Sequence, residues 1–230
     1  MTGHANSGSL GVLVSSSHFS LNVWLCIINK SYITLPKQAS VVLLKALVTY
    51  VAANAFHDSD DHVDPPQCHE NTRVTVIEKI MDWVTSKIDT ESFIMWLYGP
   101  AGAGKLAIAR KIAELCVTHN LLLASFFFFR LNSGCNTMKA FASSIAYQVT
   151  CEVPASRALI ETIIENDPLI LSSLLENQFT KLILDLLRLL SEQGHFLQRS
   201  LPPLIIIDGL DECLDQEVQT TLIRFVTSHS

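Results

Sequence analysis

The chain has 230 residues, of which 49% are hydrophobic, and it carries a formal net charge of -6. This length can hold one large domain with a sizeable core, or a domain with an additional segment. The acidic balance, without a dense run of Lys or Arg, lacks the electrostatic footprint of a duplex-binding protein, so nucleic acid is not an expected partner. The high apolar content suits strands that are buried on both faces, as in a parallel sheet.

Residues 1–56 form an N-terminal segment of uncertain fold with a Gly/Ser-rich start and apolar stretches over 21–28 and 41–56. Neither stretch has the features of a membrane span. The second is interrupted by Lys45 and is too short to cross about 30 Å of hydrocarbon, and the first lacks a basic lead-in. We therefore expect no membrane association, and we predict a buried or partner-facing helix over 41–56.

Residues 57–70 are acidic and contain two prolines, which predicts a linker leading into a domain over 71–230. His57, His62, Cys68 and His69 match no closed zinc-ligand spacing, so no metal is expected there. The six cysteines of the chain are scattered without CxxC pairs. This usage is typical of reduced thiols and predicts a cytoplasmic location.

Strands and helices are predicted to alternate after residue 71. Val74, Ile77, Ile80, Met81 and Val84 share one helical face, with Thr72 as a candidate cap. Apolar runs predict strands over 92–98, 121–129 and 204–207, and helical patterns cover 105–116, 139–148, 178–190 and 216–226. This alternation predicts an α/β domain with a three-layer α/β/α arrangement and a mainly parallel sheet.

A glycine-rich loop directly follows the first of these strands. It consists of Gly99, Pro100, Ala101, Gly102, Ala103, Gly104 and Lys105. In such a loop successive backbone N–H groups point at the phosphates of a nucleotide, the lysine adds a positive charge, and the next residue, Ser or Thr, ligates magnesium. The strand before the loop and the helix after it are the context that the motif requires. Leu106 stands where the hydroxyl is needed.

An acidic motif ends the strand over 204–207, about 100 residues after the loop. Asp208 follows four apolar residues, the place of a carboxylate that holds magnesium directly or through water. Asp211 or Glu212 could orient an attacking water as catalytic residues, although acids in a loop that caps the next helix fit both equally well. Arg130 could face phosphate, but a solvated strand-terminal arginine is the favoured interpretation.

These residues resemble the NACHT family of P-loop NTPases, within the STAND class of signalling switches, in its fungal form. The resemblance covers about residues 71–226 and rests on the glycine loop, on Gly209 directly after Asp208, and on the lead-in Cys68-His69-Glu70-Asn71-Thr72-Arg73. It implies binding of ATP or GTP with Mg²⁺, slow hydrolysis, and a nucleotide-controlled switch. It also implies self-association or contact with other protein domains.

Two departures from this resemblance predict weak or absent hydrolysis. Leu106 removes an oxygen ligand, which weakens magnesium binding. In similar proteins a further strand, placed after the acidic motif, lies between the glycine-loop strand and the Asp208 strand, and nothing after residue 226 supplies it. We therefore expect an incomplete sheet with an empty slot of about 10 Å, or forced pairing at about 4.8 Å. A five-stranded sheet whose slot is filled by residues 21–28 or another segment would overturn this expectation.

Three functions remain open on the sequence. The first is a nucleotide-binding signalling module that is at best a slow NTPase. The second is a non-catalytic interaction protein that keeps the fold but has lost nucleotide. The third, a small-molecule P-loop kinase, requires an Arg-rich lid, and the sequence has no Arg cluster. Neither the preferred base, ATP or GTP, nor the protein partners follow from the residues.

Overall fold

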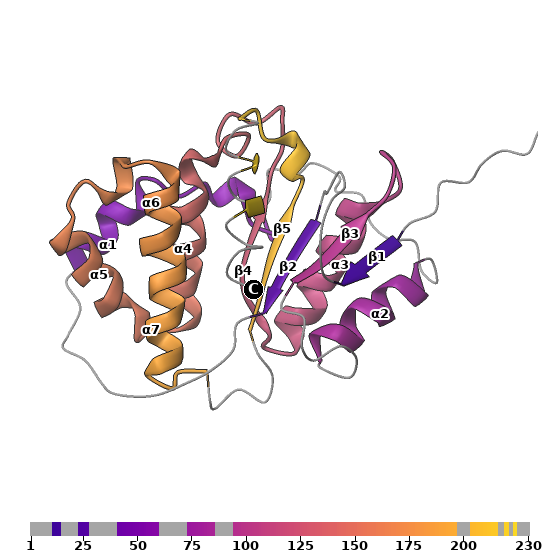
Figure 1. Ribbon diagram of the computed structural model, residues 1–230, viewed down its shortest axis with the longest axis horizontal. Helices are drawn as coiled ribbons and strands as arrows, with labels where there is room; N and C mark the ends of the chain where they lie inside the picture. Colours follow the sequence, from indigo (N-terminus) through magenta and orange to yellow (C-terminus); the bar gives the residue numbers. More distant parts are fainter. Residues whose placement is uncertain are drawn as a thin grey trace, which may run out of the picture.

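The computed structural model describes residues 11–14, 23–27, 41–59, 73–85, 94–196, 203–215, 219–220 and 223–224. Within these ranges one five-stranded sheet lies between two layers of helices (Figure 1), so the three-layer α/β fold expected from the sequence is confirmed. The sheet order is β1-β3-β2-β5-β4. The strands are β1 (Gly11–Val14), β2 (Val23–Ile27), β3 (Ile94–Tyr98), β4 (Leu122–Phe127) and β5 (Leu204–Asp208). The sheet was expected to be mainly parallel, but among the described strands only β4 and β5 pair in parallel, because the N-terminal strands enter the sheet in the opposite direction.

Strand direction divides the sheet into two groups. β4 and β5 pair in parallel, with Phe127 opposite Asp208. β2 pairs antiparallel with both β3 and β5, so β3, β4 and β5 share one direction, and β1 pairs antiparallel with the outer side of β3. The three strands predicted from the apolar runs therefore run together, whereas the two N-terminal strands run against them.

The expected slot between the glycine-loop strand and the Asp208 strand is filled by β2. Val23 pairs with Leu97 on one side and with Asp208 on the other. The prediction of an empty or collapsed slot is therefore wrong, and with it the expected gap in the sheet. The physical reason is that the inner edges of β3 and β5 carry unpaired backbone groups, which cost free energy when buried, and an extended segment of the same chain satisfies them.

Successive side chains of the inner strands point to opposite faces of the sheet and pack into two separate hydrophobic cores. On β3, Ile94 and Trp96 join the core below one helical layer, and Met95 and Leu97 join the core below the other. On β5, Ile205 and Ile207 alternate with Leu204 and Ile206 in the same way. Strands buried on both faces were expected from the apolar content, and β3, β4 and β5 confirm this expectation.

The smaller helical layer consists of α2 (Val74–Val84) and α3 (Lys105–Thr118). On α2 the predicted face is confirmed at Ile80 and Val84, which are buried, whereas Val74 is 43% exposed because it occupies the first turn of the helix. The candidate cap Thr72 lies outside the described residues. α3 begins at Lys105, directly after the glycine loop.

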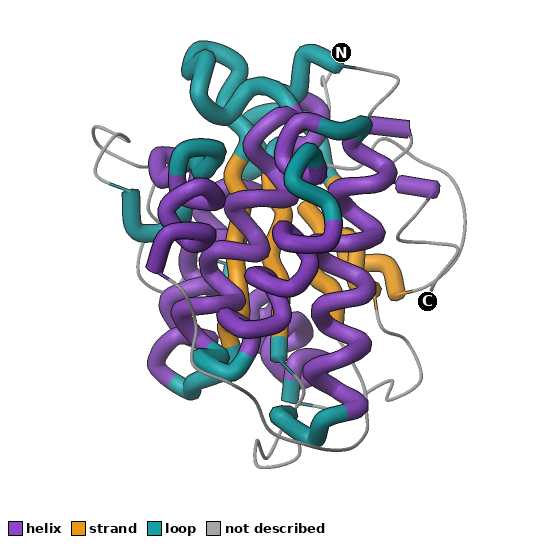
Figure 2. The backbone as a smooth tube through the Cα atoms, turned by 90° about the vertical axis from the view of Figure 1, so that its left-hand side faces the viewer, coloured by secondary structure: helices purple, strands orange, loops and turns teal. Residues whose placement is uncertain are grey.

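The larger layer covers the opposite face of the sheet and stands in front of the strands in Figure 2. It comprises α1 (Val41–Val48), α4 (Phe141–Glu152), α5 (Ser156–Asn166), α6 (Leu175–Phe179) and α7 (Leu186–Glu192). A π-helical segment, Thr180–Asp185, joins α6 to α7 into one continuous helix. Short 3-10 turns occur at Ala53–Ala55, Met138–Ala140, Ile170–Ser172 and Leu210–Glu212.

Two of these helices differ from their predictions. The helix expected over 41–56 ends at Val48 and is followed by a turn and the 3-10 segment Ala53–Ala55. α5 was not predicted at all. For the helix expected over 216–226, Gln219, Thr220, Ile223 and Arg224 are helical, and the remaining residues lie outside the described ranges.

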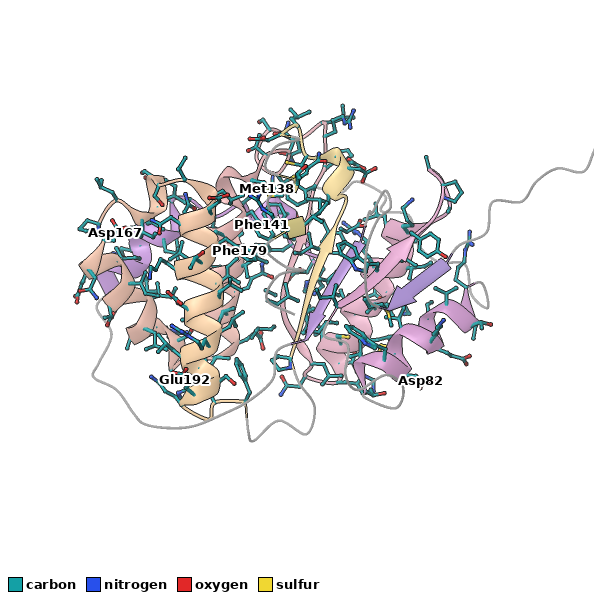
Figure 3. The ribbon with its side chains drawn as sticks, viewed as in Figure 1. Asp82, Met138, Phe141, Asp167, Phe179 and Glu192 are labelled. Atoms are coloured by element: carbon teal, nitrogen blue, oxygen red, sulfur yellow. The ribbon has the colours of Figure 1, made fainter. Side chains whose placement is uncertain are left out.

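Phenylalanine side chains pack the larger helical layer against β4. Phe126 lies 5.2 Å from Phe141 of α4, ring centroid to centroid, and Phe141 stacks on Phe179 of α6 at 6.2 Å. Figure 3 shows Met138, Phe141 and Phe179 where the helical layer meets the sheet. The phenylalanine run is therefore core over residues 126–128, as predicted, because aromatic pairs at these distances add to their hydrophobic burial. Phe129 is 39% exposed.

Candidate functional site

The glycine loop connects β3 to α3 at the carboxyl end of β3. Gly102 has φ of +76° and Gly104 has φ of +84°, a left-handed conformation that residues with a Cβ adopt at a cost. Gly104 is the N-cap of α3. The loop also contains a tight turn, in which the N–H of Ala103 donates to the carbonyl of Pro100 at 3.2 Å. The strand, loop and helix succeed one another as a phosphate-binding loop requires.

Lys105 is buried, with 8% of its surface exposed. Its Nζ donates to the carbonyl oxygen of Gly99 at 2.8 Å and to that of Pro100 at 2.9 Å. These two bonds use two of the three hydrogen-bond donors of the ammonium group. A phosphate would therefore exchange with carbonyl partners that already hold the lysine at the loop.

Leu106 is half-buried and packs against the hydrophobic core between α2, α3 and the sheet. Its side chain is hydrocarbon, so position 106 offers no oxygen to a cation. Among the described residues, no group of three or more His, Cys, Asp or Glu side chains is arranged to hold a metal ion.

Asp208 ends β5 and is 5% exposed. Its backbone carbonyl accepts a hydrogen bond from the N–H of Phe128 at 2.9 Å, which continues the pairing of β4 and β5 by one residue. Burial raises the pKa of the Asp208 carboxyl to about 7, and the carboxylates of Glu212 and Asp211 add to the increase. Lys105 and a backbone hydrogen bond from Gly209 act in the opposite direction. At neutral pH a cation that binds Asp208 would therefore displace a proton.

Gly209 turns the chain sharply after Asp208. Its φ is +69°, and a Cβ built on this residue would lie 2.6 Å from the carbonyl oxygen of Phe128. Real Cβ atoms do not approach a backbone oxygen so closely, so only glycine fits between β5 and the neighbouring β4. The resemblance relied on this small residue, and the structure supplies the physical reason for it.

Asp211 and Glu212 lie in the 3-10 turn after Gly209 and connect the end of β5 to the loop after β4. The Glu212 carboxylate accepts a hydrogen bond from the N–H of Arg130 at 3.0 Å. The Arg130 guanidinium donates to the carbonyl of Asp211 at 2.9 Å. Arg130 is exposed, as favoured on the sequence. Its hydrogen bonds with Glu212 and Asp211 connect the loop after β4 to the turn after β5.

Arg73 is a residue that the sequence analysis passed over except as part of the lead-in motif. It precedes α2 with φ of +63°, and its side chain reaches the glycine loop. A Cβ built on Gly104 would lie 3.8 Å from Arg73 Nη2 and 3.9 Å from Nε. The proximity is tertiary and leaves no periodic signal in the sequence; an arginine at a left-handed position cannot be recognised there.

One strand separates the two halves of the site. β2 places the end of β3, with the glycine loop, two strand intervals from the end of β5, with Asp208, which corresponds to about 10 Å. The loop supplies glycine backbone and Lys105 on one side, and Asp208 supplies a carboxylate on the other. A helix N-terminus after a glycine loop is backbone of the kind that favours an anion, whereas Leu106 offers no oxygen to a magnesium ion.

Together the fold and the site define a mixed α/β domain with a glycine loop between its strand β3 and helix α3. In a comparison with protein-family models, the chain matches the family described as nephrocystin 3, N-terminal, over residues 72–230. The match covers more than half of the chain, which therefore belongs to this family. No curated protein and no solved structure matches the chain. Strands β1 and β2 and helix α1 precede the matched region.

Further findings concern the predictions on membrane spans, thiols and zinc ligands. In the parts of the chain that the structure describes, no helix is both long enough and apolar enough to cross a membrane. Cys116, Cys151 and Cys213 are free thiols, of which Cys116 and Cys213 are buried. Of the residues considered for zinc, only His57 lies within the described ranges, where burial lowers its pKa and its Nδ1 lies 3.2 Å from Ser125 Oγ.

Proposed function

We propose that the chain is a nucleoside-triphosphate-binding signalling module of the NACHT type, which binds ATP or GTP and hydrolyses it weakly or not at all. The observation that carries this proposal is the glycine loop between β3 and α3, with Gly102 and Gly104 in left-handed conformations and Lys105 held at the loop. Such a loop and the positive end of α3 favour a polyphosphate.

We expect weak hydrolysis because the residues that would hold magnesium are incomplete. Asp208 would hold the ion, but Leu106 supplies no oxygen, and Glu212 already accepts a hydrogen bond from Arg130. A hydrogen bond to a charged group is worth about 1.5–3 kcal/mol. Loss of a contact of this size would lower magnesium–nucleotide affinity by roughly tenfold to a hundredfold. Nucleotide without magnesium keeps its contacts with the loop.

The second candidate function is a non-catalytic interaction protein that retains this fold. It is favoured by Lys105, whose ammonium group already has two carbonyl partners, and by the packing of the half-buried Leu106 against the core. In either case we place the protein in the cytoplasm, where its free buried thiols are stable, and expect it to act through self-association or other protein domains.

Calorimetry of ATP and ADP binding, with and without magnesium, separates the two candidates. The wild-type chain is expected to bind both nucleotides without magnesium and to gain little when magnesium is added. Leu106→Ser, which restores a hydroxyl, is expected to gain roughly tenfold or more in affinity from magnesium. Absence of binding by both proteins would refute nucleotide binding and leave the interaction protein.

A further inference from the structure

We propose that Arg73 is a phosphate-binding residue of the nucleotide site. This inference rests on the proposed nucleotide binding. It adds that the guanidinium of Arg73, at the start of α2, binds the phosphates of the nucleotide. The Nε and Nη2 atoms of the guanidinium, its two-point donor edge, both lie within 4 Å of a Cβ built on Gly104. This is the edge with which arginine binds phosphate oxygens in a bidentate manner.

Two other cations near the loop, Lys105 and Arg110, already have partners in the structure. Lys105 is bonded to the carbonyls of Gly99 and Pro100. Arg110, the next cation on α3, lies over the ring of Phe127 at 5.8 Å from the ring centroid, so it faces β4. The guanidinium of Arg73 is exposed, and within the described residues no carboxylate forms an ion pair with it.

The backbone of Arg73 supplies an independent observation. Its φ of +63° lies in the left-handed region, which is costly for arginine and easy for glycine. The carbonyl of Arg73 accepts hydrogen bonds from the N–H groups of Val76 and Ile77, a role that glycine would fill equally well. Strain of this kind that local structure does not require is a signature of functional sites.

A phosphate-binding Arg73 also compensates for the position of Leu106. With an oxygen ligand for magnesium missing, the negative charge of a polyphosphate needs another partner. A guanidinium at the loop neutralises part of this charge without a metal ion. The inference therefore predicts that the contribution of Arg73 is largest when magnesium is absent, and that it depends on the phosphates and not on the base.

The test is calorimetry on the full chain in EDTA with ATP, ADP, inorganic pyrophosphate and adenosine as probes. Arg73→Gln is expected to weaken ATP, ADP and pyrophosphate binding by roughly tenfold to a hundredfold and to leave any adenosine binding unchanged. Arg73→Lys, which keeps the charge but loses the two-point edge, is expected to fall between. Lys79→Gln, the same change of charge on an exposed residue of α2, is the matched control, with an expected change of about twofold or less.

Arg73→Gly separates binding from folding. It relieves the left-handed strain, so we expect the Tm to rise by about 1–4 °C while phosphate binding is still weakened. Equal ATP binding by wild type and Arg73→Gln would overturn the inference, as would a loss of adenosine binding equal to the loss of ATP binding. Absence of ATP binding by the wild-type chain would instead refute the proposed function itself.

Discussion

Gly209 offers the sharpest test of the geometry around Asp208. In Gly209→Ala the new Cβ meets the carbonyl oxygen of Phe128 at 2.6 Å, and this oxygen belongs to backbone that cannot rotate away. Gly102→Ala is a matched control, because Gly102 also has positive φ, at +76°, but a Cβ there meets no atom within 4 Å. The two substitutions therefore share the conformational cost and differ in the steric one.

The magnitudes follow from these two costs. Placing a Cβ on left-handed backbone costs roughly 1–2 kcal/mol in either variant. Forcing β4 and β5 apart at Phe128 adds about 1–3 kcal/mol, the usual range for overpacking. We therefore expect Gly209→Ala to lose about 2–5 kcal/mol of unfolding free energy and Gly102→Ala about 1–2 kcal/mol. In a chain of this length each kcal/mol corresponds to roughly 2–4 °C in Tm.

Urea unfolding followed by circular dichroism measures both free energies under the same conditions. Because the control shares the positive φ, the difference between the variants isolates the contact between Gly209 and Phe128. Equal losses in the two variants would show that the turn after Asp208 is not held against β4 as the structure has it, and the placement of Asp208 would fall with it.

Two other predictions concern β2 and the buried carboxyl. Leu25→Pro removes a backbone N–H from β2, the strand between β3 and β5, so it should lower the unfolding free energy by about 3 kcal/mol or more. The control Leu13→Pro makes the same change in the edge strand β1 and should cost clearly less. Equal urea midpoints for the two variants would place β2 outside the sheet. Because the pKa of Asp208 is raised to about 7 from an unfolded value of about 3.9, the folded state holds a proton that the unfolded state releases, and stability falls as the pH rises from about 4 to about 7. Asp208→Asn should therefore gain stability relative to wild type across this window, and a constant difference in Tm would contradict the burial of a titrating carboxyl.

Local patterns in the sequence predicted the part of the fold that carries the site. β3, β4 and β5 are apolar runs bounded by turn residues, and the glycine loop lies between a strand and a helix as expected. Such features depend on residues near one another in the chain, so periodicity and motif spacing reveal them. The helix over 178–190 was also predicted, although its π-helical segment leaves no mark in the pattern.

Features that depend on distant residues were not predicted. The apolar stretch over 21–28 was noticed, but its pairing with β3 and β5 requires contacts across more than 60 residues that no local pattern specifies. β1 was missed because its glycine-rich surroundings resemble a loop. α5 had a usable signal, because Ile160 and Ile164 are buried four residues apart and Pro154 precedes the helix.

The same distinction holds for the candidate site. The loop residues and Asp208 were identified from their motifs, and their positions at the carboxyl ends of β3 and β5 agree with the topology. Three other contacts join segments that are distant in the sequence. They are the hydrogen bond from Arg130 to Glu212, the close approach of Gly209 to Phe128, and the approach of Arg73 to Gly104. These contacts are decided by tertiary packing and could be recognised only in three dimensions.

The central claim is that the glycine loop binds the polyphosphate of a nucleotide without depending on magnesium. The most direct measurement is calorimetric titration of the full wild-type chain with ATP in EDTA, and with adenosine under the same conditions. We expect saturable one-to-one ATP binding that is at least tenfold tighter than adenosine binding, because the loop and its cations act on the phosphates. No heat of binding with ATP, or equal affinity for ATP and adenosine, would contradict it.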